Sequence, residues 1–340
     1  MTELRVELGK RSYGITVGQG LLDRAGEYFK FDGRALIITD DGVPAEYARR
    51  VAAAVKGESE IITVEQGEGA KSLAVLEDVL NKMTEMKLSR SDCVIGVGGG
   101  VVGDLSGFAA AVYMRGIDFY NVPTTLLAMV DSSIGGKTAV NLGGIKNIVG
   151  AFHQPSGVLI DTDTLATLDG RLRASGLCEA VKMAATSNAE LFEYFEMTDA
   201  DEIYKNIEWV IAEALRIKKA VVEKDECEAG LRKILNFGHT LGHGIEAERG
   251  GSLYHGECVG LGMLPLCSEG VRVRLLSILD KLGLPTEYTG DVNAALEFAA
   301  HDKKASGKGI DVILVDLIGS FKIERMSVEG LADLVTKTFK

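Results

Sequence analysis

The sequence predicts a two-domain α/β protein: an α/β domain built on a parallel sheet over residues 1–162, followed by a mainly helical domain over residues 163–340. The 340 residues suffice for two domains of roughly 150 residues each. Short β-branched runs alternate with helix-like stretches before Asp161, and helical periodicity prevails after it. Because no low-complexity linker separates the two parts, we expect them to pack tightly around a cleft.

The first domain alternates strand-like and helix-like segments. Runs of β-branched and apolar residues predict strands at 4–8, 14–17, 35–39, 61–64, 93–97, 119–122 and 158–160. Apolar residues at helical spacing predict helices at 21–29, 44–54, 73–86 and 102–112. The opening pair of strands is typical of a hairpin, and the rest is the β-α-β alternation of a parallel sheet covered on both faces.

The second domain reads as helical over most of its length. The predicted helical stretches are 164–195, 203–222, 231–248, 259–282 and 294–300. Only the ILVDLIG and FKIERM segments look like strands, and they would form a pair.

Composition excludes several classes of protein. The 37 Lys and Arg against 49 Asp and Glu leave a net charge of −12, which argues against a general nucleic-acid or anionic-membrane binder. Five scattered cysteines are an odd number in a long chain, so a disulfide scaffold is not expected. There is neither a signal-peptide core nor a run of about 18 apolar residues. We expect a cytoplasmic protein.

A glycine loop follows the strand at 93–97. Gly98, Gly100 and Gly103 have the spacing and context in which a backbone approaches a pyrophosphate at a helix N-terminus, although glycines also serve close strand–helix packing. The loop follows a late strand, and Asp118, about 20 residues on, precedes its strand instead of following it. Asp40, after the strand at 35–39, is a better ribose acceptor. We infer nucleotide binding with a non-standard strand order.

A second glycine-rich segment resembles the end of a phosphate-binding P-loop. It reads Gly135-Gly136-Lys137-Thr138, but the leading glycine of that motif falls on Asp131. The motif therefore fails, and a P-loop kinase is not expected.

Three of the five histidines cluster within 17 positions in a glycine-rich setting, which favours a metal site over isolated surface histidines. His239 and His243 share a helix face, and His255 could fold back beside them. Imidazole with a carboxylate is a ligand set that suits zinc. Spacing alone does not decide which histidines bind.

Several side chains could complete this set. The carboxylate could come from Glu179, Glu246 or Glu257. Cys178 and Cys258 stand beside two of these glutamates and would bind zinc as thiolates, or else fill the core as small apolar residues.

Basic residues fall near these segments in an otherwise acidic chain. Lys137 and Lys146 stand out because they lie in GGKTAVNLGGIKN, which we interpret as a functional loop too rich in glycine to need them for helix stability. Cations here would suit a substrate with a phosphate or carboxylate. The wider set is Arg115, Lys137, Lys146, Lys182, Lys218 and Arg232.

Six ordered motifs between about residues 68 and 262 resemble the 3-dehydroquinate synthase family. They are GGGVVGDLSGFAAAVYMRGI, VPTTLLAMVDSSIGGKTAVN, KNIVGAFHQP, SGLCEAVK, LNFGHTLGH and HGE. The resemblance implies a Rossmann-like NAD-binding domain, a helical metal-binding domain and a homodimer. It also implies conversion of 3-deoxy-D-arabino-heptulosonate 7-phosphate (DAHP) to 3-dehydroquinate and phosphate in the shikimate pathway, with catalytic NAD and a divalent metal (zinc or cobalt).

The resemblance assigns roles position by position. It makes Glu179, His239 and His255 the metal ligands and His243 a catalytic group near the leaving phosphate. Asp131, Lys137, Lys182 and Lys218 join His243 as catalytic groups. Substrate contacts fall on Arg115, which could reach across a dimer interface, and on Asn147, Arg232 and Asn236. One of Lys303 and Lys304 should join them, and we take it to be Lys304. NAD contacts fall on Asp40, Glu68, Lys71, Gly100, Val101, Val102, Gly103, Asp104, Thr124, Thr125, Lys137, Lys146, Thr164, Leu165, Ala166 and Thr167.

The family reaction combines redox and acid–base steps. The resemblance implies oxidation at C5 by NAD, β-elimination of phosphate, return of the hydride, ring opening and an intramolecular aldol closure. Three departures from the family pattern occur: Cys178 and Cys258 replace alanine, and Ile145 replaces glycine. The alternatives are a metal-dependent polyol dehydrogenase such as glycerol dehydrogenase, and a related sugar-phosphate cyclase whose substrate lacks the carboxylate. A nucleotide- and metal-binding regulatory protein would need a further interaction segment, which we do not find.

Overall fold

The computed structural model describes residues 1–304 and 309–339, without the side chains of 300–304. The chain divides into two compact units, Met1–Leu168 and Asp169–Lys340. The division falls a few residues beyond the expected boundary at residue 162. In the described part of the chain no helix combines the length and apolar character needed to cross a membrane.

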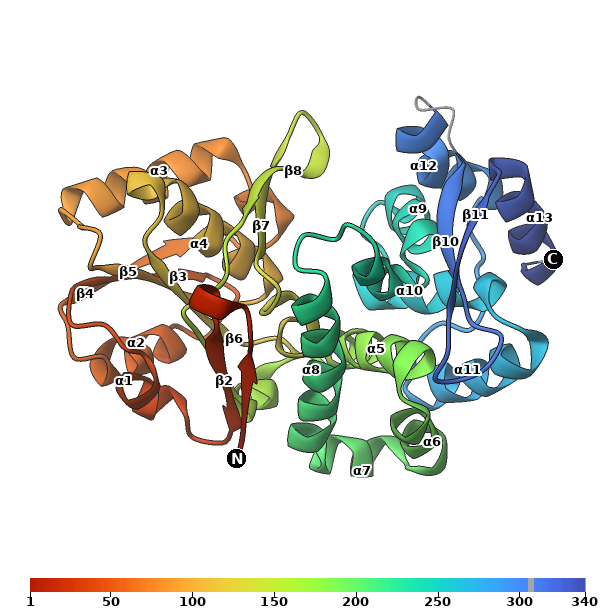
Figure 1. Cartoon of the computed structure of the whole chain (residues 1–340), viewed down its shortest axis with the longest axis horizontal. Coiled ribbons are helices and arrows are strands. Elements are labelled where there is room, and N and C mark those ends of the chain that lie inside the picture. The colour runs from red at the N-terminus through yellow and green to blue at the C-terminus, as the bar shows by residue number, and fades with distance from the viewer. Residues whose placement is uncertain (305–308, 340) are drawn as a thin grey trace. The chain divides into compact units, whose positions relative to one another are not determined.

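The first unit is built on a seven-stranded sheet with the order β1-β2-β9-β6-β5-β3-β4. Figure 1 labels β2, β6, β5, β3 and β4 of this sheet. β1 and β2 form the expected antiparallel hairpin, and the remaining neighbours, from β2 to β4, are parallel. The predicted parallel sheet and non-standard strand order are thus confirmed. The strands are β1 (Thr2–Val6), β2 (Tyr13–Gly18), β3 (Ala35–Asp40), β4 (Ser59–Val64), β5 (Cys93–Gly98), β6 (Asp118–Pro123) and β9 (Gly157–Asp161).

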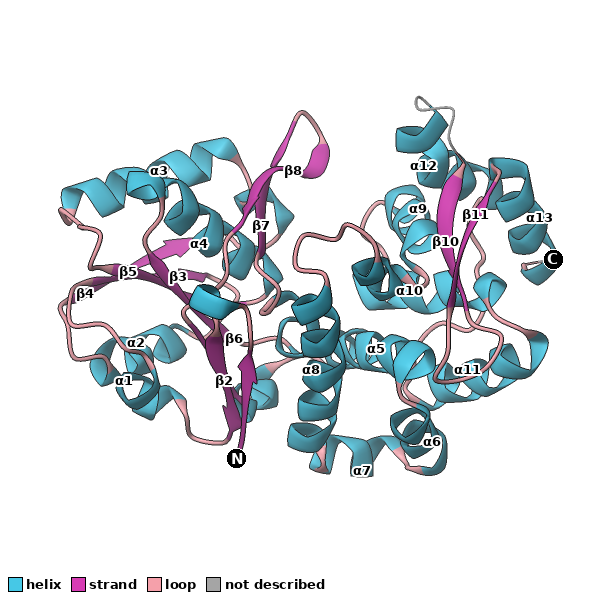
Figure 2. Cartoon of the chain, in the orientation of Figure 1, coloured by secondary structure: helices cyan, strands magenta, loops and turns pink. Residues whose placement is uncertain are grey.

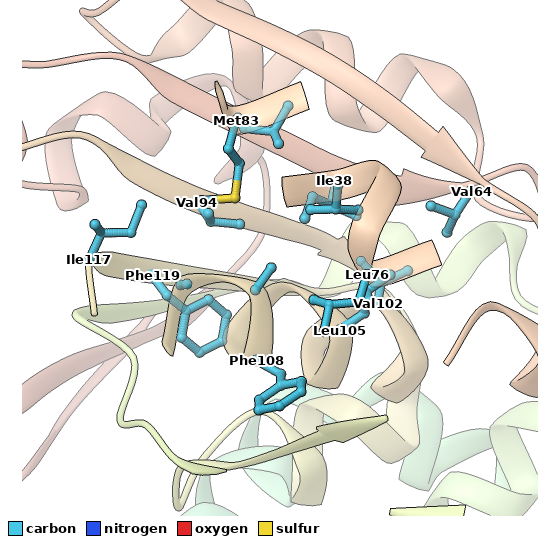
Figure 3. Packing of buried hydrophobic residues seen from close by; sticks show 14 of the residues in the cluster. Ile38, Val64, Leu76, Met83, Val94, Val102, Leu105, Phe108, Ile117 and Phe119 are labelled. Carbon is cyan, nitrogen blue, oxygen red and sulfur yellow. The ribbon is translucent and has the colours of Figure 1, made fainter. Parts of the chain in front are cut away.

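Helices cover both faces of this sheet. Alternate residues of a strand point to opposite faces. Ile38 of β3 accordingly joins one apolar cluster with α3 (Leu73–Glu85) and α4 (Gly100–Val112), which Figure 3 shows. Ile37 joins a second cluster with α1 (Ala25–Tyr28) and α2 (Ala45–Ala54). Burial on both faces explains why the strands read as continuous apolar runs.

The strand order reverses at β3. β3 pairs with β4 on one side and with β5 on the other, and Ile38 stands opposite Gly96 in the parallel register of β3 and β5. The carboxyl ends of these strands therefore bring Asp40 and Gly98 to the same edge. Open α/β sheets bind their ligands at such a switch point.

The segment around Lys137 and Lys146 corrects one expectation. It is not an irregular loop but an antiparallel hairpin of β7 (Lys137–Leu142) and β8 (Ile145–Phe152). Gly143 and Gly144 form its turn with φ values of 60° and 78°, a left-handed conformation that glycine adopts without steric cost. The glycines that suggested a loop are those that the hairpin turn requires.

The second unit is mainly helical, with one two-stranded sheet (Figure 2). The predicted strand pair is present as β10 (Ile310–Leu314) and β11 (Lys322–Met326), but β10 begins three residues before the predicted ILVDLIG segment and shares two residues with it, Ile313 and Leu314. Some predicted helices are divided: Asn188 caps α6 and so separates it from α5, and Pro265 lies between α10 and α11. The helix at 328–338 was not predicted. The helices are α5 (Gly170–Ser187), α6 (Ala189–Met197), α7 (Ala200–Lys205), α8 (Ile207–Lys224), α9 (His239–Arg249), α10 (His255–Met263), α11 (Glu269–Lys281), α12 (Val292–Lys304) and α13 (Val328–Thr338).

Candidate active site

Three helices of the second unit bring one carboxylate and three imidazoles together. Glu179 lies on α5, His239 and His243 lie on the first turns of α9, and His255 begins α10. The ligand nitrogens of the three histidines all lie within 4.8 Å of one another. The structure therefore joins residues that are up to 76 positions apart in the sequence, since 255 − 179 = 76.

Glycines allow these helices to approach so closely. A Cβ on Gly256 would lie 1.9 Å from the Ser175 carbonyl oxygen on α5. A Cβ on Gly242 would lie 3.0 Å from the Cys258 carbonyl oxygen, which joins α9 to α10. Close backbone approach is one of the main uses of glycine. The glycine-rich setting of the histidines is therefore the condition for their convergence.

The geometry within the cluster suits a divalent cation. Glu179 Oε1 lies 3.8 Å from His239 Nε2 and 3.6 Å from His255 Nε2. Ligands bound at 2.0–2.2 Å in a tetrahedron are about 3.3–3.6 Å apart. Glu179 Oε1 is buried and has no hydrogen-bond partner among the described residues. A buried polar atom without a partner is costly, and a cation among these three atoms would satisfy it.

The Nδ1 atoms of His239 and His255 already form hydrogen bonds within the protein. His239 Nδ1 donates to the Phe237 carbonyl oxygen at 3.2 Å, and His255 Nδ1 donates to Glu246 Oε2 at 3.0 Å. Both hydrogen bonds leave the Nε2 lone pair available, as in metal-binding histidines.

The pKa values of the two imidazoles shift in opposite directions. Burial, the charge of Lys182 and the neighbouring imidazoles lower the pKa of His239 well below its usual value. Burial also lowers the pKa of His255, but the Glu246 hydrogen bond and the Glu179 charge outweigh it and give a net increase.

The structure separates the three candidate carboxylates. Glu179 faces the histidines, and Glu246 contacts His255 from behind. Glu257 is turned to Arg171, which donates to both of its carboxylate oxygens at 2.6 and 2.7 Å. Glu257 therefore serves as an ion-pair partner at the start of α10.

The two neighbouring cysteines are buried. A Cβ on Gly260 of α10 would lie 3.2 Å from Cys178 Sγ, so that thiol fills the contact between α5 and α10. Burial and the adjacent Glu179 charge raise the pKa of the Cys178 thiol well above its usual value. This packing matches the interpretation of Cys178 as small apolar filler.

His243 lies one turn beyond His239 and is the most exposed of the three histidines. Its ring centroid lies 5.3 Å from that of His239 and 5.7 Å from that of His255. An exposed imidazole beside the more buried pair is accessible to a bound substrate.

Three buried cations occur in the same unit: Lys182 on α5, Lys218 on α8 and Arg232 in the short helix Leu231–Asn236. α8 packs against both α5 and the short helix. Buried lysines and arginines are rare unless they are paired or bind an anion.

The segment that carries Arg232 is held by carboxylates. Asp225 accepts the backbone N–H groups of Ala229, Gly230 and Arg232 at 2.7, 2.7 and 2.9 Å. Asn236 donates to Glu228 Oε1 at 2.9 Å. Sequence reasoning did not single out Asp225 or Glu228, because no motif marks them. The only available signal was their position in the acidic turn just before Arg232.

The side chains of Lys303 and Lys304 lie outside the described part of the chain.

The glycine loop of the first unit joins β5 to α4 without room for side chains. A Cβ on Gly98 would lie 2.6 Å from Val102 Cγ2, and one on Gly103 would lie 3.1 Å from the Asn121 amide. No side chain of the described residues caps the N-terminus of α4. The start of this helix therefore leaves backbone N–H groups without a side-chain partner, an arrangement that suits an anion.

Other predicted NAD residues line the carboxyl edge of the sheet. Asp40 is buried at the end of β3 and accepts the N–H groups of Gly42 and Val43, and burial raises its pKa. Thr124 follows β6, and its N–H donates to the Gly98 carbonyl oxygen at 2.9 Å. Thr164 and Thr167 lie in the short helix Thr162–Thr167 after β9.

Lys71 links α4 to the β7–β8 hairpin. Its ammonium group lies 2.6 Å from Asp104 Oδ2 and also donates to Asn147 Oδ1. The hairpin is further tied by Asn141, which donates to Glu68 Oε1 at 2.8 Å. Glu68, Lys71, Asp104 and Asn147 thus form one network of side chains.

Three predicted cationic residues lie at the surface of the first unit. Lys137, Lys146 and Arg115 are exposed, and Arg115 has a left-handed backbone with φ of 67°. Asp131 is half-buried in the helical turn Ala128–Ser132.

Comparison with known proteins decides the family. A family model of the 3-dehydroquinate synthase N-terminal region matches residues 61–175, and the corresponding C-terminal model matches residues 176–305. The chain belongs to the 3-dehydroquinate synthase family. It is accordingly a lyase-type enzyme, and its function is 3-dehydroquinate synthesis.

Full-length relatives carry the same name. A 3-dehydroquinate synthase of Clostridium acetobutylicum is 41% identical, covering 96% of this chain and 97% of that protein. One from Enterococcus faecalis is 41% identical with 97% of both covered, and one from Streptococcus mutans is 38% identical, covering 98% of this chain and 100% of that protein.

Solved structures agree with the family fold. A 2-deoxy-scyllo-inosose synthase complexed with carbaglucose-6-phosphate, NAD+ and Co2+ superposes with a TM-score of 0.89 at 25% identity, covering 99% of this chain and 100% of that one. ValA, a 2-epi-5-epi-valiolone synthase of Streptomyces hygroscopicus with NAD+ and Zn2+ bound, superposes with a TM-score of 0.87 at 27% identity. The superposition covers 96% of this chain and 96% of that one. A Schizosaccharomyces pombe glycerol dehydrogenase shares only the fold, with a TM-score of 0.61 at 18% identity over 95% of this chain and 88% of that one.

Proposed function

We propose that this member of the 3-dehydroquinate synthase family converts DAHP to 3-dehydroquinate and phosphate in the shikimate pathway, with catalytic NAD and a divalent metal. The observation that carries the proposal is the buried Glu179 Oε1, which has no hydrogen-bond partner in the described part of the chain and faces the Nε2 atoms of His239 and His255. The positive charges of Lys182, which also pairs with Glu179, and of Lys218 and Arg232 in the same unit support an anionic substrate. The solved relatives that bind NAD+ with Co2+ or Zn2+ support the same pair of cofactors.

Glu179, His239 and His255 would hold the metal. Three protein ligands leave a position open for substrate hydroxyls, and a bound divalent cation supplies Lewis acidity that acidifies a hydroxyl and polarises a ketone. Oxygen and imidazole ligands suit zinc as well as cobalt.

The switch point of the first unit would bind NAD, which supplies a reversible hydride acceptor. The pyrophosphate would meet the N-terminus of α4, which has no side-chain cap among the described residues, and Gly98 and Gly103 let this helix pack closely against β5 and β6. Asp40 would accept a ribose hydroxyl, and Thr124 and Thr164 would line the same edge.

The other residues would bind the substrate and move protons. Lys218, Arg232 and Lys182 would bind the phosphate and carboxylate through charge-assisted hydrogen bonds. His243 would carry a proton at its imidazole, a common general acid–base group in enzymes. Asp131 would orient a lysine, and Asn147 and Asn236 would contact the substrate.

The proposal includes a cytoplasmic homodimer. The β7–β8 hairpin exposes apolar side chains, with Leu142 at 50%, Ile145 at 52% and Ile148 at 58% exposure. Exposed apolar side chains gathered on one element are typical of an interaction surface. The five cysteines are all free, which is in keeping with a reducing compartment.

The test is incubation of the purified protein with DAHP, a divalent metal and NAD at a small fraction of the substrate concentration, with phosphate release followed in time. We expect many phosphates for each NAD and no accumulation of NADH. A polyol dehydrogenase would instead form one NADH for each substrate oxidised. A related cyclase would release phosphate from a seven-carbon ketose phosphate without a carboxylate and would leave DAHP intact.

A further inference from the structure

Glu246 contacts one of the proposed metal-binding histidines from the side away from the other ligands. It lies on α9, seven residues after His239, and its Oε2 accepts the Nδ1 proton of His255 at 3.0 Å. The Nε2 atom of the same ring faces Glu179 Oε1 at 3.6 Å. One imidazole is thus held between two carboxylates, with one at each nitrogen.

The hydrogen bond from Nδ1 decides which nitrogen carries the proton. A carboxylate can only accept, so the ring keeps its hydrogen on Nδ1 and its lone pair on Nε2. His239 is held in the same tautomer, but by the neutral carbonyl of Phe237. His255 therefore has a charged hydrogen-bond partner, whereas His239 has a neutral one.

Packing holds His255 less firmly than His239. The His255 side chain is 31% exposed, whereas that of His239 is 13% exposed. The backbone before His255 is anchored by Glu257, which accepts the Tyr254 N–H at 2.7 Å and pairs with Arg171. Those contacts fix where α10 begins and leave the rotation of the His255 ring to its own side-chain contacts.

We propose that Glu246 is a positioning residue for metal binding: it sets the tautomer and the orientation of His255, so that Nε2 is presented to the cation. This inference rests on the proposed ligand set of Glu179, His239 and His255. Glu246 does not itself contact the metal in this arrangement, because its carboxylate bonds the opposite side of the ring.

The experiment measures Co2+ affinity of the full chain without substrate or NAD, using the ligand-field absorption of the bound ion. Glu246→Ala should bind Co2+ about 10–100-fold more weakly than the wild type. Glu246→Gln keeps a neutral hydrogen-bond acceptor, so its Co2+ affinity should lie between those of the wild type and Glu246→Ala. Nitrogen NMR of the metal-free protein should show the His255 proton on Nδ1 in the wild type and its redistribution in Glu246→Ala.

Glu248→Ala is the matched control. Glu248 lies two residues further along α9, is exposed to a similar extent (16% against 20%) and bonds Tyr288 instead of a histidine. Its replacement should leave Co2+ affinity unchanged. If Glu246→Ala does not fold, the Co2+ affinity of Glu246→Gln tests the proposal by itself, because a glutamine side chain has nearly the same shape as the glutamate it replaces.

Failure of this inference and failure of the proposed function give different results. If Glu179→Gln abolishes Co2+ binding while both Glu246 variants bind as tightly as the wild type, Glu246 has no positioning role and the ligand set stands. If the wild type and Glu179→Gln bind Co2+ equally, the ligand set is wrong and the inference falls with it. If Glu246→Ala and Glu248→Ala lose Co2+ affinity to the same extent, the cause is a general effect on α9, and the proposal is also overturned.

Discussion

Lys182 and Glu179 form a buried ion pair one turn apart on α5, and the pair uses only one of the two carboxylate oxygens. Lys182 pairs with Oε2, and Oε1 is left facing His239 and His255. Neither side chain is more than 2% exposed. The lysine therefore compensates part of the buried charge and leaves the oxygen that faces the two imidazoles free.

Replacing Lys182 should destabilise the metal-free protein. Lys182→Met leaves the buried Glu179 carboxylate without its cation, and breaking a buried pair costs about 3–5 kcal/mol of unfolding free energy. A cation bound beside Oε1 would partly replace the lost charge, so the deficit should shrink when Zn2+ is added. Urea unfolding with chelator and with Zn2+ measures both values.

Lys205→Met is the control for this change. Lys205 and Glu202 have the same i,i+3 spacing on α7, but both are exposed. Exposed pairs contribute little, so this variant should unfold like the wild type in both conditions. A deficit of Lys182→Met that is the same with and without Zn2+ would contradict a cation beside Glu179.

His243→Ala should retain the metal and lose rate. If His243 moves a proton without binding the metal, kcat should fall about 10²–10⁴-fold at unchanged metal content. His255→Ala should lose bound metal together with turnover. Metal analysis and phosphate-release kinetics on both variants separate the two roles, and loss of metal in His243→Ala would make His243 a ligand.

Gly256→Ala should push α10 away from α5. The added Cβ would lie 1.9 Å from the Ser175 carbonyl oxygen, and such overpacking costs about 1–3 kcal/mol of unfolding free energy. Co2+ affinity should fall as well, because His255 is the neighbouring residue. Gly270→Ala on α11 meets no atom within 4 Å and should be neutral or slightly stabilising. Wild-type stability and Co2+ affinity in Gly256→Ala would show that the close contact is not required.

Asp225 should contribute stability that depends on pH. The backbone hydrogen bonds from Arg232 and Gly230 lower its pKa below the ordinary 3.8. A carboxyl group with a lowered folded-state pKa stabilises the fold above its unfolded pKa and loses that effect as pH falls through its folded pKa. Asp225→Asn should therefore be less stable than the wild type above about pH 5, and the difference should disappear at lower pH.

Urea unfolding of both proteins across this range checks the sign. A stability difference that grows on acidification would exclude the carboxylate as its source. Because Asp225 shapes the segment that carries Arg232, the same variant should also raise KM for DAHP with a smaller effect on kcat.

Local patterns in the sequence were sufficient for most of the fold. Apolar runs and helical spacing placed β3, β5, α2, α3 and α4 within a few residues of their bounds, because burial on a sheet or helix face is a property of neighbouring residues. The β7–β8 hairpin was missed, since its turn glycines are equally typical of an irregular loop. The capped break at Asn188 was missed because apolar residues at helical spacing continue across it.

The candidate site depends on contacts that a linear pattern does not contain. The sequence by itself determined that His239 and His243 share a helix face, because four residues make about one helical turn. It left Glu179, Glu246 and Glu257 equivalent as ligands. Only the tertiary structure separated them: Glu179 faces the proposed cation site, Glu246 bonds Nδ1 of His255, and Glu257 pairs with Arg171. The direction of each carboxylate depends on how α5, α9 and α10 pack across their glycines.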